Sequence, residues 1–356
     1  MPDPETHAAD GRAAGEVQHG SQAERDCFVA GGLKLLSGKR FKMKRDDECY
    51  HATVSSDEGK TWQRQGNMVS RLGPLTNMGC LEGVAIQIQN GTHQGRIAVP
   101  FYAEMDGEHA DYTREMKGGY AIFRGKRILL QTHTHVPEMG GTFVMFSDDE
   151  GATWTQSKGF LMGYFRDGYM GHMTADEPTI AELKDGRLLC FMRGTGGCIL
   201  KSYSSDGGEY WTKVETTDLA NSNSPAFVAR VPTNGDLVCV WNQMSVDEIQ
   251  RGFRRGRLSI AISQDDGQTW SHFKNLEVSE GIDPTITRVK APELTAMVRG
   301  PQEMDAVPDG FLHFGYPEVY FTSDEICVFY HATSPAHTER VPPRWRVFPI
   351  FGLYQD

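Results

Sequence analysis

The sequence has no excess of positive charge. Its 36 Lys and Arg stand against 47 Asp and Glu, which gives a net charge of -11 and a pI near 5.6. Nucleic acids and anionic membrane surfaces both bind clustered positive charge, so this balance argues against either as a partner. An anionic ligand would have to be held by a local group of arginines.

Long apolar runs and sustained helical periodicity are also missing. No stretch approaches the roughly 20 apolar residues of a membrane-spanning helix, and none has the apolar core of a signal peptide. The localisation stays open, because a secreted or periplasmic chain whose leader has been removed would resemble a cytoplasmic one. Residues 1–25 are polar and predict a flexible arm, whereas residues 26–356 contain no Pro/Ser-rich linker and predict one domain.

Metal-ligand spacing is absent as well. Seven cysteines occur without a C-x-x-C pair or a Cys/His ligand pattern, which indicates buried thiols rather than a disulfide framework or a zinc site. We therefore expect neither a metal nor a cofactor.

An eight-residue motif occurs four times. "SSDEGKTW" (55–62), "SDDEGATW" (147–154), "SSDGGEYW" (204–211) and "SQDDGQTW" (263–270) all fit Ser-x-Asp-x-Gly-x-x-Trp. The motif lacks the final Glu of a calcium loop. Ser and Asp can instead bond the backbone of their own turn, Gly tolerates positive φ and Trp adds a large apolar surface. Short β-rich runs such as "RLSIAI" precede the copies, so each copy predicts a fastened β-hairpin.

A second repeat lies between the four copies of this motif, which we call Asp-boxes. "EGVAIQIQNG" (82–91), "EPTIAELKDG" (177–186), "SPAFVARVPTNG" (224–235) and "YPEVYFTSDE" (316–325) each begin with a polar residue and continue as an apolar strand into a turn. The two repeats together predict an all-β propeller with four-stranded antiparallel blades. The first residues of its inner strands, among them Glu82, Glu177 and Tyr316, would meet at one mouth.

Three longer segments resemble the sialidase (neuraminidase) superfamily, whose six-bladed propellers carry these Asp-boxes. "DEPTIAELKDGRLLCFMR" (176–193) is similar to the stretch in which a Glu opens an inner strand and an Arg closes the next, which implies Glu177 and Arg193. "GRLSIAISQDDGQTW" (256–270) is similar to the strand in which an Arg precedes a box, here Arg257. "GYPEVYFTSDEICVFYH" (315–331) is similar to the strand opened by the nucleophilic tyrosine, here Tyr316.

The resemblance implies a consistent chemistry. The anomeric carbon of a sialoside carries a carboxylate, so a neutral phenol approaches it more easily than a carboxylate would. A phenol with a pKa near 10 needs a neighbouring base, for which Glu177 is the candidate. Arginine forks match the substrate carboxylate, which implies that Arg193 and Arg257 bind it and that Glu82 lines the pocket.

Two positions depart from the family pattern. The family's Arg-Ile-Pro at the first inner strand is missing, so either Arg25 supplies the third arginine or this chain has none. The acid/base aspartate should lie in a loop before the first box, where "RDDECYHATVSS" offers Asp46 and Asp47, with Asp47 slightly preferred.

Two classes of function remain open from the sequence. The first is a retaining exo-glycoside hydrolase that releases sialic acid or a related acidic sugar from a glycan, with Tyr316, Glu177 and Asp47 or Asp46 as catalytic residues. The second is a non-catalytic Asp-box propeller that binds a glycan or a protein. A third possibility is a glycosidase with the sialidase fold and a different sugar specificity.

Overall fold

The structure is a computed structural model built almost entirely from strands. It describes residues 33–46, 49–70, 76–81, 84–104, 119–123, 126–129, 140–164, 172–194, 196–251, 253–291, 296–299, 307–334 and 341–355. The predicted arm and the start of the predicted domain, residues 1–32, lie outside this part of the chain.

Most strands belong to five antiparallel blades. The first blade contains β1 (Leu33–Lys34), β2 (Arg40–Arg45), β3 (Cys49–Ser55) and β4 (Gln63–Ser70). The second blade contains β5 (Thr76–Gly79), β6 (Ile86–Gln87), β7 (Ile97–Glu104), β10 (Gly140–Ser147) and β11 (Thr155–Gln156). The third blade contains β14 (Ala175–Glu182), β15 (Leu188–Gly194), β16 (Cys198–Ser204) and β17 (Glu215–Ala220), and the fourth contains β18 (Phe227–Arg230), β19 (Leu237–Trp241), β20 (Arg257–Ser263) and β21 (Ser271–Val278). The fifth blade contains β23 (His313–Phe321), β24 (Glu325–Thr333) and β25 (Arg344–Pro349).

The remaining elements are short. The pair β12 (Gly163–Tyr164) and β13 (His172–Met173) forms a two-stranded sheet, and β8 (Gly119–Phe123), β9 (Lys126–Leu129) and β22 (Ala296–Arg299) form a three-stranded one. Helix α3 (Val246–Gln250) lies between β19 and β20, and the short helices η1 (Gly91–His93) and η2 (Ile350–Tyr354) follow β6 and β25.

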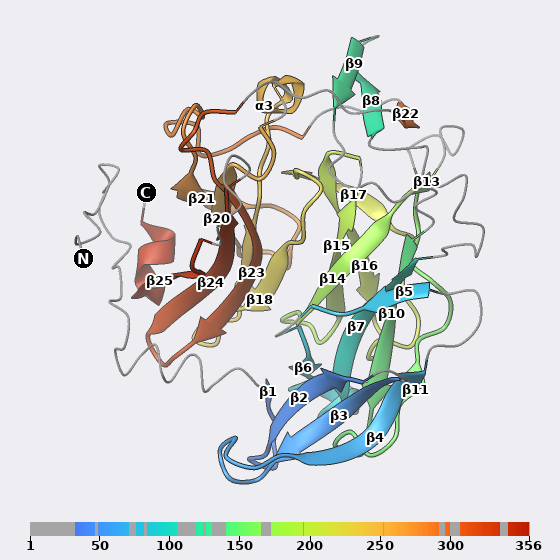
Figure 1. Cartoon of the computed structure of the whole chain (residues 1–356). Helices are drawn as coiled ribbons and strands as arrows, with labels where there is room; N and C mark the ends of the chain where they lie inside the picture. Colours follow the sequence, from blue (N-terminus) through green and yellow to red (C-terminus); the bar gives the residue numbers. More distant parts are fainter. Residues whose placement is uncertain are drawn as a thin grey trace.

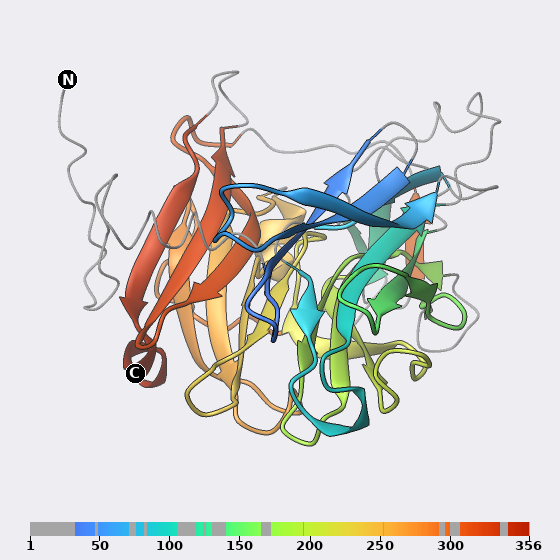
Figure 2. The ribbon, with the colours of Figure 1, turned by 90° about the horizontal axis from the view of Figure 1, so that it is seen from below.

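The blades are arranged around a common centre. Figure 1 shows β7, β14, β18 and β23 towards the middle of the ring, and contacts of β14 with β7 and β18, and of β18 with β23, link consecutive blades there. In Figure 2 the fifth blade (orange to red) and the second (cyan to green) lie on opposite sides, with the first (blue) in front. A separate apolar cluster fills each interface between consecutive blades, from first to fifth. Burial of both faces explains why β10, β14, β15 and β20 are buried along their whole length.

The all-β propeller is confirmed, with mostly four-stranded blades. The described residues form five blades, so the predicted number of six stays a prediction. Five of the six cysteines in the described part of the chain are buried, as the sequence indicated. None of the helices among the described residues is long and apolar enough to cross a membrane.

The four Asp-boxes are hairpin fasteners, as predicted. In each, the serine hydroxyl donates to the aspartate Oδ1 at 2.7–2.9 Å and accepts from the glycine N–H at 2.8–2.9 Å. The residue before the tryptophan donates its N–H to the same aspartate. Hydrogen bonds from Thr61 are the main reason that the pKa of Asp57 falls to about 2.

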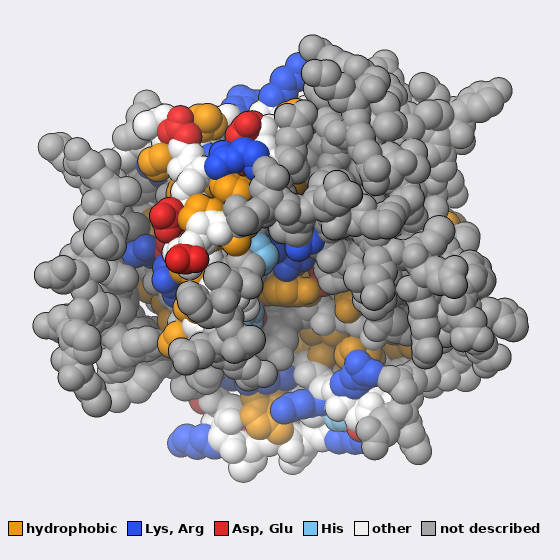
Figure 3. All heavy atoms as spheres, turned by 45° about the horizontal axis from the view of Figure 1, so that its top comes forward, with side chains coloured by type: hydrophobic (Ala, Val, Ile, Leu, Met, Phe, Trp, Pro, Cys, Tyr) orange, Lys and Arg blue, Asp and Glu red, His pale blue; other side chains and the backbone are white. Residues whose placement is uncertain are grey.

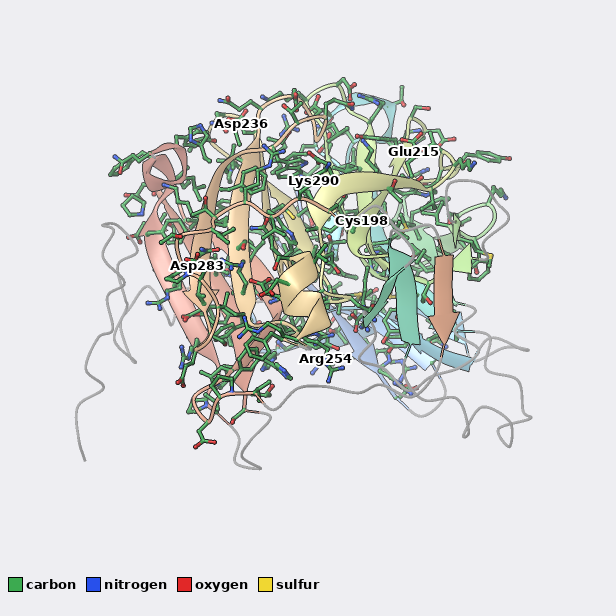
Figure 4. The ribbon with its side chains drawn as sticks, turned by 90° about the horizontal axis from the view of Figure 1, so that it is seen from above. Cys198, Glu215, Asp236, Arg254, Asp283 and Lys290 are labelled. Carbon is green, nitrogen blue, oxygen red and sulfur yellow. The ribbon has the colours of Figure 1, made fainter. Side chains whose placement is uncertain are left out.

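The box of the third blade lies at the rim opposite to Glu177. Strand register fixes this, because Ser204 pairs with Leu188 and Leu188 with Glu182, whereas Asp176 pairs with Arg193 at the other end of the same blade. The fourth blade has the same polarity: in Figure 4, Arg254 and Asp236 lie at opposite rims. The fasteners of the third and fourth blades are therefore distant from Glu177, Arg193 and the arginines that precede β20.

Removing one fastener should cost stability and leave the opposite rim intact. We expect Asp149→Ala to lower the free energy of unfolding by about 1 kcal/mol, because Ser147 and Thr153 lose their shared acceptor. Asp149→Asn keeps an acceptor oxygen and should lose less. Denaturant unfolding measures the difference, and a variant with unchanged stability but abolished activity would contradict the fastener role.

Candidate active site

Tyr316 and Glu177 form the centre of the site. The Tyr316 hydroxyl donates a hydrogen bond to Glu177 Oε1 at 2.9 Å, although 139 residues separate the two in sequence. Tyr316 belongs to the inner strand β23 of the fifth blade, and Glu177 to the inner strand β14 of the third. Glu177 is only 6% exposed and Tyr316 is half-buried, so the structure brings a partly accessible phenol onto a buried carboxylate.

Two arginines flank this pair. Arg193, near the end of β15, donates to the second oxygen of Glu177, Oε2, at 2.6 Å and is 5% exposed. Arg255, two residues before β20, places its guanidinium 5.5 Å from the centre of the Tyr316 ring. Asn223, in the loop from β17 to β18, accepts from Arg193 Nε at 2.8 Å on its side chain and from Arg255 Nη2 at 3.3 Å on its carbonyl. The third, fourth and fifth blades thus all contribute.

The charges fix the resting protonation state of the pair. Burial alone would raise the pKa of Glu177, but the positive charges of Arg193 and Arg255 and the hydrogen bonds to its oxygens hold it below its usual range. Burial and the neighbouring Glu177 raise the pKa of Tyr316, against the opposing effect of the two arginines. The proton therefore rests on the phenol and the carboxylate is ionised, which is the state that a base-activated nucleophile requires.

The backbone is strained at all of these positions except Arg193. Eight non-glycine residues in the described part of the chain have positive φ, and four of them are Glu177 (39°), Asn223 (55°), Arg255 (50°) and Tyr316 (54°). Such conformations cost about 1–3 kcal/mol each and gather at functional sites.

Proline explains the local geometry of the nucleophile and the base. Glu177 precedes Pro178 and Tyr316 precedes Pro317, and a proline cannot donate to a strand ladder. The register of β14 shifts between Asp176 and Thr179, and that of β23 between Gly315 and Glu318. Each bulge interrupts the alternation of side chains between the two faces of the strand and redirects one polar side chain. The two redirected side chains, Glu177 and Tyr316, are the ones that meet.

The placement expected for Arg257 is corrected. Its side chain is fully buried, and its Nη2 donates to Glu248 Oε1 of α3 at 2.8 Å and to the Asp283 carbonyl at 3.0 Å. Its Nη1 donates to the Ile286 carbonyl. Arg257 therefore fastens α3 and the loop after β21 to the fourth blade, and Arg255 is the arginine that faces Tyr316.

The candidates for the acid/base aspartate are only partly described. Asp46 accepts from the Cys49 N–H and from Arg64 Nη1, each at 2.8 Å, and lies 3.4 Å from His51 Nδ1. The donor atoms of Asp46, Cys49 and His51 lie within 4.8 Å of one another, as metal ligands do. Arg64 contacts two of the three, Asp46 and Cys49, and this positive charge disfavours a cation there. Asp47, Glu82 and Arg25 lie outside the described residues.

Further polar side chains surround the pair. The His331 ring lies 6.4 Å from that of Tyr316. Burial, followed by Asp176 and Glu177, raises the pKa of Tyr102 at the end of β7. Burial lowers the pKa of His313 to about 4, and the positive charges of the nearby Arg254 and Arg255 contribute to this shift. Figure 3 shows histidine and Lys or Arg side chains beside apolar ones around a hollow on the face that is turned forward.

A tyrosine held on a buried carboxylate between two arginines, at the inner strands of an Asp-box propeller, defines a sialidase-like class of propeller. The model of the BNR repeat-like domain family matches residues 31–328, so the chain belongs to that family. The sequence resemblance described above is thereby confirmed.

Known proteins agree with this assignment. The anhydrosialidase of Macrobdella decora is 26% identical over 223 residues, which are 60% of this chain and 23% of the relative. The structure of a leech intramolecular trans-sialidase with 2,7-anhydro-Neu5Ac is 18% identical, with a TM-score of 0.51 over 85% of this chain and 36% of that chain. An intramolecular trans-sialidase from Ruminococcus gnavus with oseltamivir carboxylate is 19% identical, with a TM-score of 0.50 over 86% and 51%. At these identities the structures establish the fold alone, and the chain spans about a quarter of the curated relative.

Proposed function

We propose that this protein is a retaining exo-glycosidase of the sialidase type, which cleaves a terminal sialic acid or a related acidic sugar from a glycoconjugate. The observation that carries the proposal is the 2.9 Å hydrogen bond from Tyr316 to the ionised Glu177, flanked by Arg193 and Arg255. Relatives that cleave or transfer sialic acid are consistent with it.

In the proposed reaction Tyr316 Oη attacks the anomeric carbon while its proton moves to Glu177 Oε1. The bond to the leaving oxygen breaks, and that oxygen takes a proton from an aspartic acid. The described contacts engage both oxygens of Asp46, which favours Asp47 as the acid. Water, activated by the same aspartate, then attacks the anomeric carbon of the glycosyl-tyrosine, and the bond to Tyr316 Oη breaks. Tyr316 regains its proton from Glu177, so the two displacements leave the configuration unchanged.

The two arginines give the site its preference for an acidic sugar. Arg193, Arg254 and Arg255 carry three positive charges against the two negative charges of Glu177 and Asp176, which both act on Arg193. A substrate carboxylate would balance the remaining charge, and the planar guanidinium fork suits it. A neutral exo-substrate would leave a buried positive charge unpaired.

Turnover of a fluorogenic aryl sialoside tests the proposal, with proton NMR of the first product. Release of the retained anomer is the expected result. An anhydro sugar would show that a hydroxyl of the sugar itself takes the place of water, as the intramolecular trans-sialidase relatives suggest. Binding of a sialylated glycan without turnover would identify a non-catalytic glycan-binding propeller, and turnover of other aryl glycosides alone would identify another sugar.

Arg255 should contribute to affinity for the carboxylate. Arg255→Lys keeps the charge and removes the planar fork, so we expect affinity for sialic acid to fall about tenfold. Calorimetry measures the change. Arg257→Lys is the matched control: it should lower the unfolding temperature, because α3 and its neighbouring loop lose their anchor, and leave affinity unchanged. The opposite pattern would return Arg257 to the binding site.

A further inference from the structure

We infer that Asn223 is a positioning residue that sets the distance between Arg193 and Arg255 and the orientation of their guanidinium groups. By doing so it tunes how well the site recognises a carboxylate, and this second part of the inference rests on the function proposed above. Its side-chain Oδ1 accepts a hydrogen bond from Arg193 Nε at 2.8 Å, and its backbone carbonyl accepts one from Arg255 Nη2 at 3.3 Å. One residue, 3% exposed, thereby links guanidinium groups from the third and fourth blades.

The two guanidinium groups need such a link. Burial and the charge of Arg193 both lower the pKa of Arg255, so the two cations repel each other in a poorly solvated site. Glu177 already attracts both arginines, and a further carboxylate in the place of Asn223 would cancel charge that an anionic substrate needs. The amide and carbonyl oxygens of Asn223 are neutral acceptors, so they orient both arginines and preserve the net positive charge.

A rigid loop fixes Asn223 in place. The Asn221 side chain accepts from the Ser224 N–H at 3.0 Å and donates to the Ser224 carbonyl at 3.1 Å, which brackets Asn223 from both sides. The Ser222 N–H donates to the Asn242 carbonyl of the fourth blade at 3.1 Å. Residues 221–224 are all buried. Movement of Asn223 would therefore break several buried hydrogen bonds.

The left-handed conformation restricts which residue can serve here. At φ of 55° glycine is unstrained and asparagine is among the best tolerated of the other residues. Glycine keeps the backbone carbonyl for Arg255 and loses the side-chain acceptor for Arg193. Aspartate keeps both acceptors and adds a negative charge. Asn223→Gly and Asn223→Asp therefore separate the geometric role from the electrostatic one.

The first test needs no substrate. Nitrogen-15 NMR of arginine side chains in the full chain follows solvent exchange of the Arg193 Nε–H, assigned by its loss in Arg193→Lys. We expect slow exchange in the wild type and exchange at least tenfold faster in Asn223→Gly, with a similar unfolding temperature. Slow exchange in both proteins would overturn the inference.

The second test measures carboxylate discrimination, the ratio of affinities for sialic acid and its methyl ester. Asn223→Gly and Asn223→Asp should both reduce this ratio several-fold, the first by disorienting the forks and the second by cancelling charge. A purely structural role would weaken both ligands equally. Asn234→Gly, which alters an asparagine beside Asp236 at the opposite rim, should leave the ratio unchanged.

The two tests fail in different ways. If Asn223→Gly releases the Arg193 Nε–H but the wild type binds no sialic acid, the positioning contact stands and the proposed substrate is wrong. If the wild type prefers the acid and Asn223→Gly keeps the full preference, the proposed function stands and Asn223 has no positioning role.

Discussion

Tyr316→Phe is expected to reduce turnover of an aryl sialoside by roughly 1,000-fold or more, because it removes the oxygen that would form the covalent bond. The phenyl ring is retained, so contacts with His331 and Arg255 should persist. Glu177 keeps its short hydrogen bond from Arg193, which should limit the loss of stability to about 1–2 kcal/mol. Steady-state kinetics and thermal unfolding measure the two effects.

Tyr330→Phe is a matched control for this variant. Tyr330 lies in the neighbouring strand β24 and also donates its hydroxyl to a carboxylate, that of Glu277. Glu277 additionally accepts from Arg346 at 2.8 Å, so the two phenols have similar surroundings. We expect the same modest loss of stability from Tyr330→Phe with turnover retained. Equal turnover in Tyr316→Phe and Tyr330→Phe would exclude Tyr316 as the nucleophile.

The fold was predictable from local chemistry. Each box contains its own hydrogen-bond donors and acceptors, so the hairpin can be read from eight residues without knowledge of the rest of the chain. Polar first residues followed by apolar strands predicted inner strands opening at one rim, and Tyr316 and Glu177 are two such residues. The number of blades depends on long-range closure of the ring, which no local pattern encodes.

The arginines were harder to assign because their directions depend on backbone conformation. Within "RRGR" (254–257), strand alternation would point the second and fourth residues the same way, but Arg255 has positive φ and leaves that alternation. Arg257 remains in the strand and forms an ion pair with Glu248 on α3, a partner that the box motif does not predict. Asn223 gave the weakest signal, one asparagine in "NSNSP", since its role comes from contacts with two other blades.

The second large effect is expected at Glu177. Glu177→Gln keeps the shape of the side chain and cannot accept the phenol proton, so turnover should fall by roughly 100- to 10,000-fold. The charge of Arg193 also loses its buried partner, which should lower stability. Glu248→Gln breaks the comparable buried pair with Arg257, away from the phenol, and serves as control: stability should fall while turnover per folded molecule is retained.

The pH profile gives a further readout for the same residue. The pKa of Glu177 is held below its ordinary value of 4.5, because the arginine charges outweigh burial. A lowered pKa means that the active carboxylate persists as pH falls below 4.5 and is lost only as pH passes down through the lowered value. The stability from its ion pair follows the same direction: it is complete above the ordinary pKa and is lost as pH falls through the lowered one. Wild-type turnover should thus have an acidic limb below pH 4.5 that is absent from the residual activity of Glu177→Gln. An acidic limb that persists in this variant would assign the general base to another group.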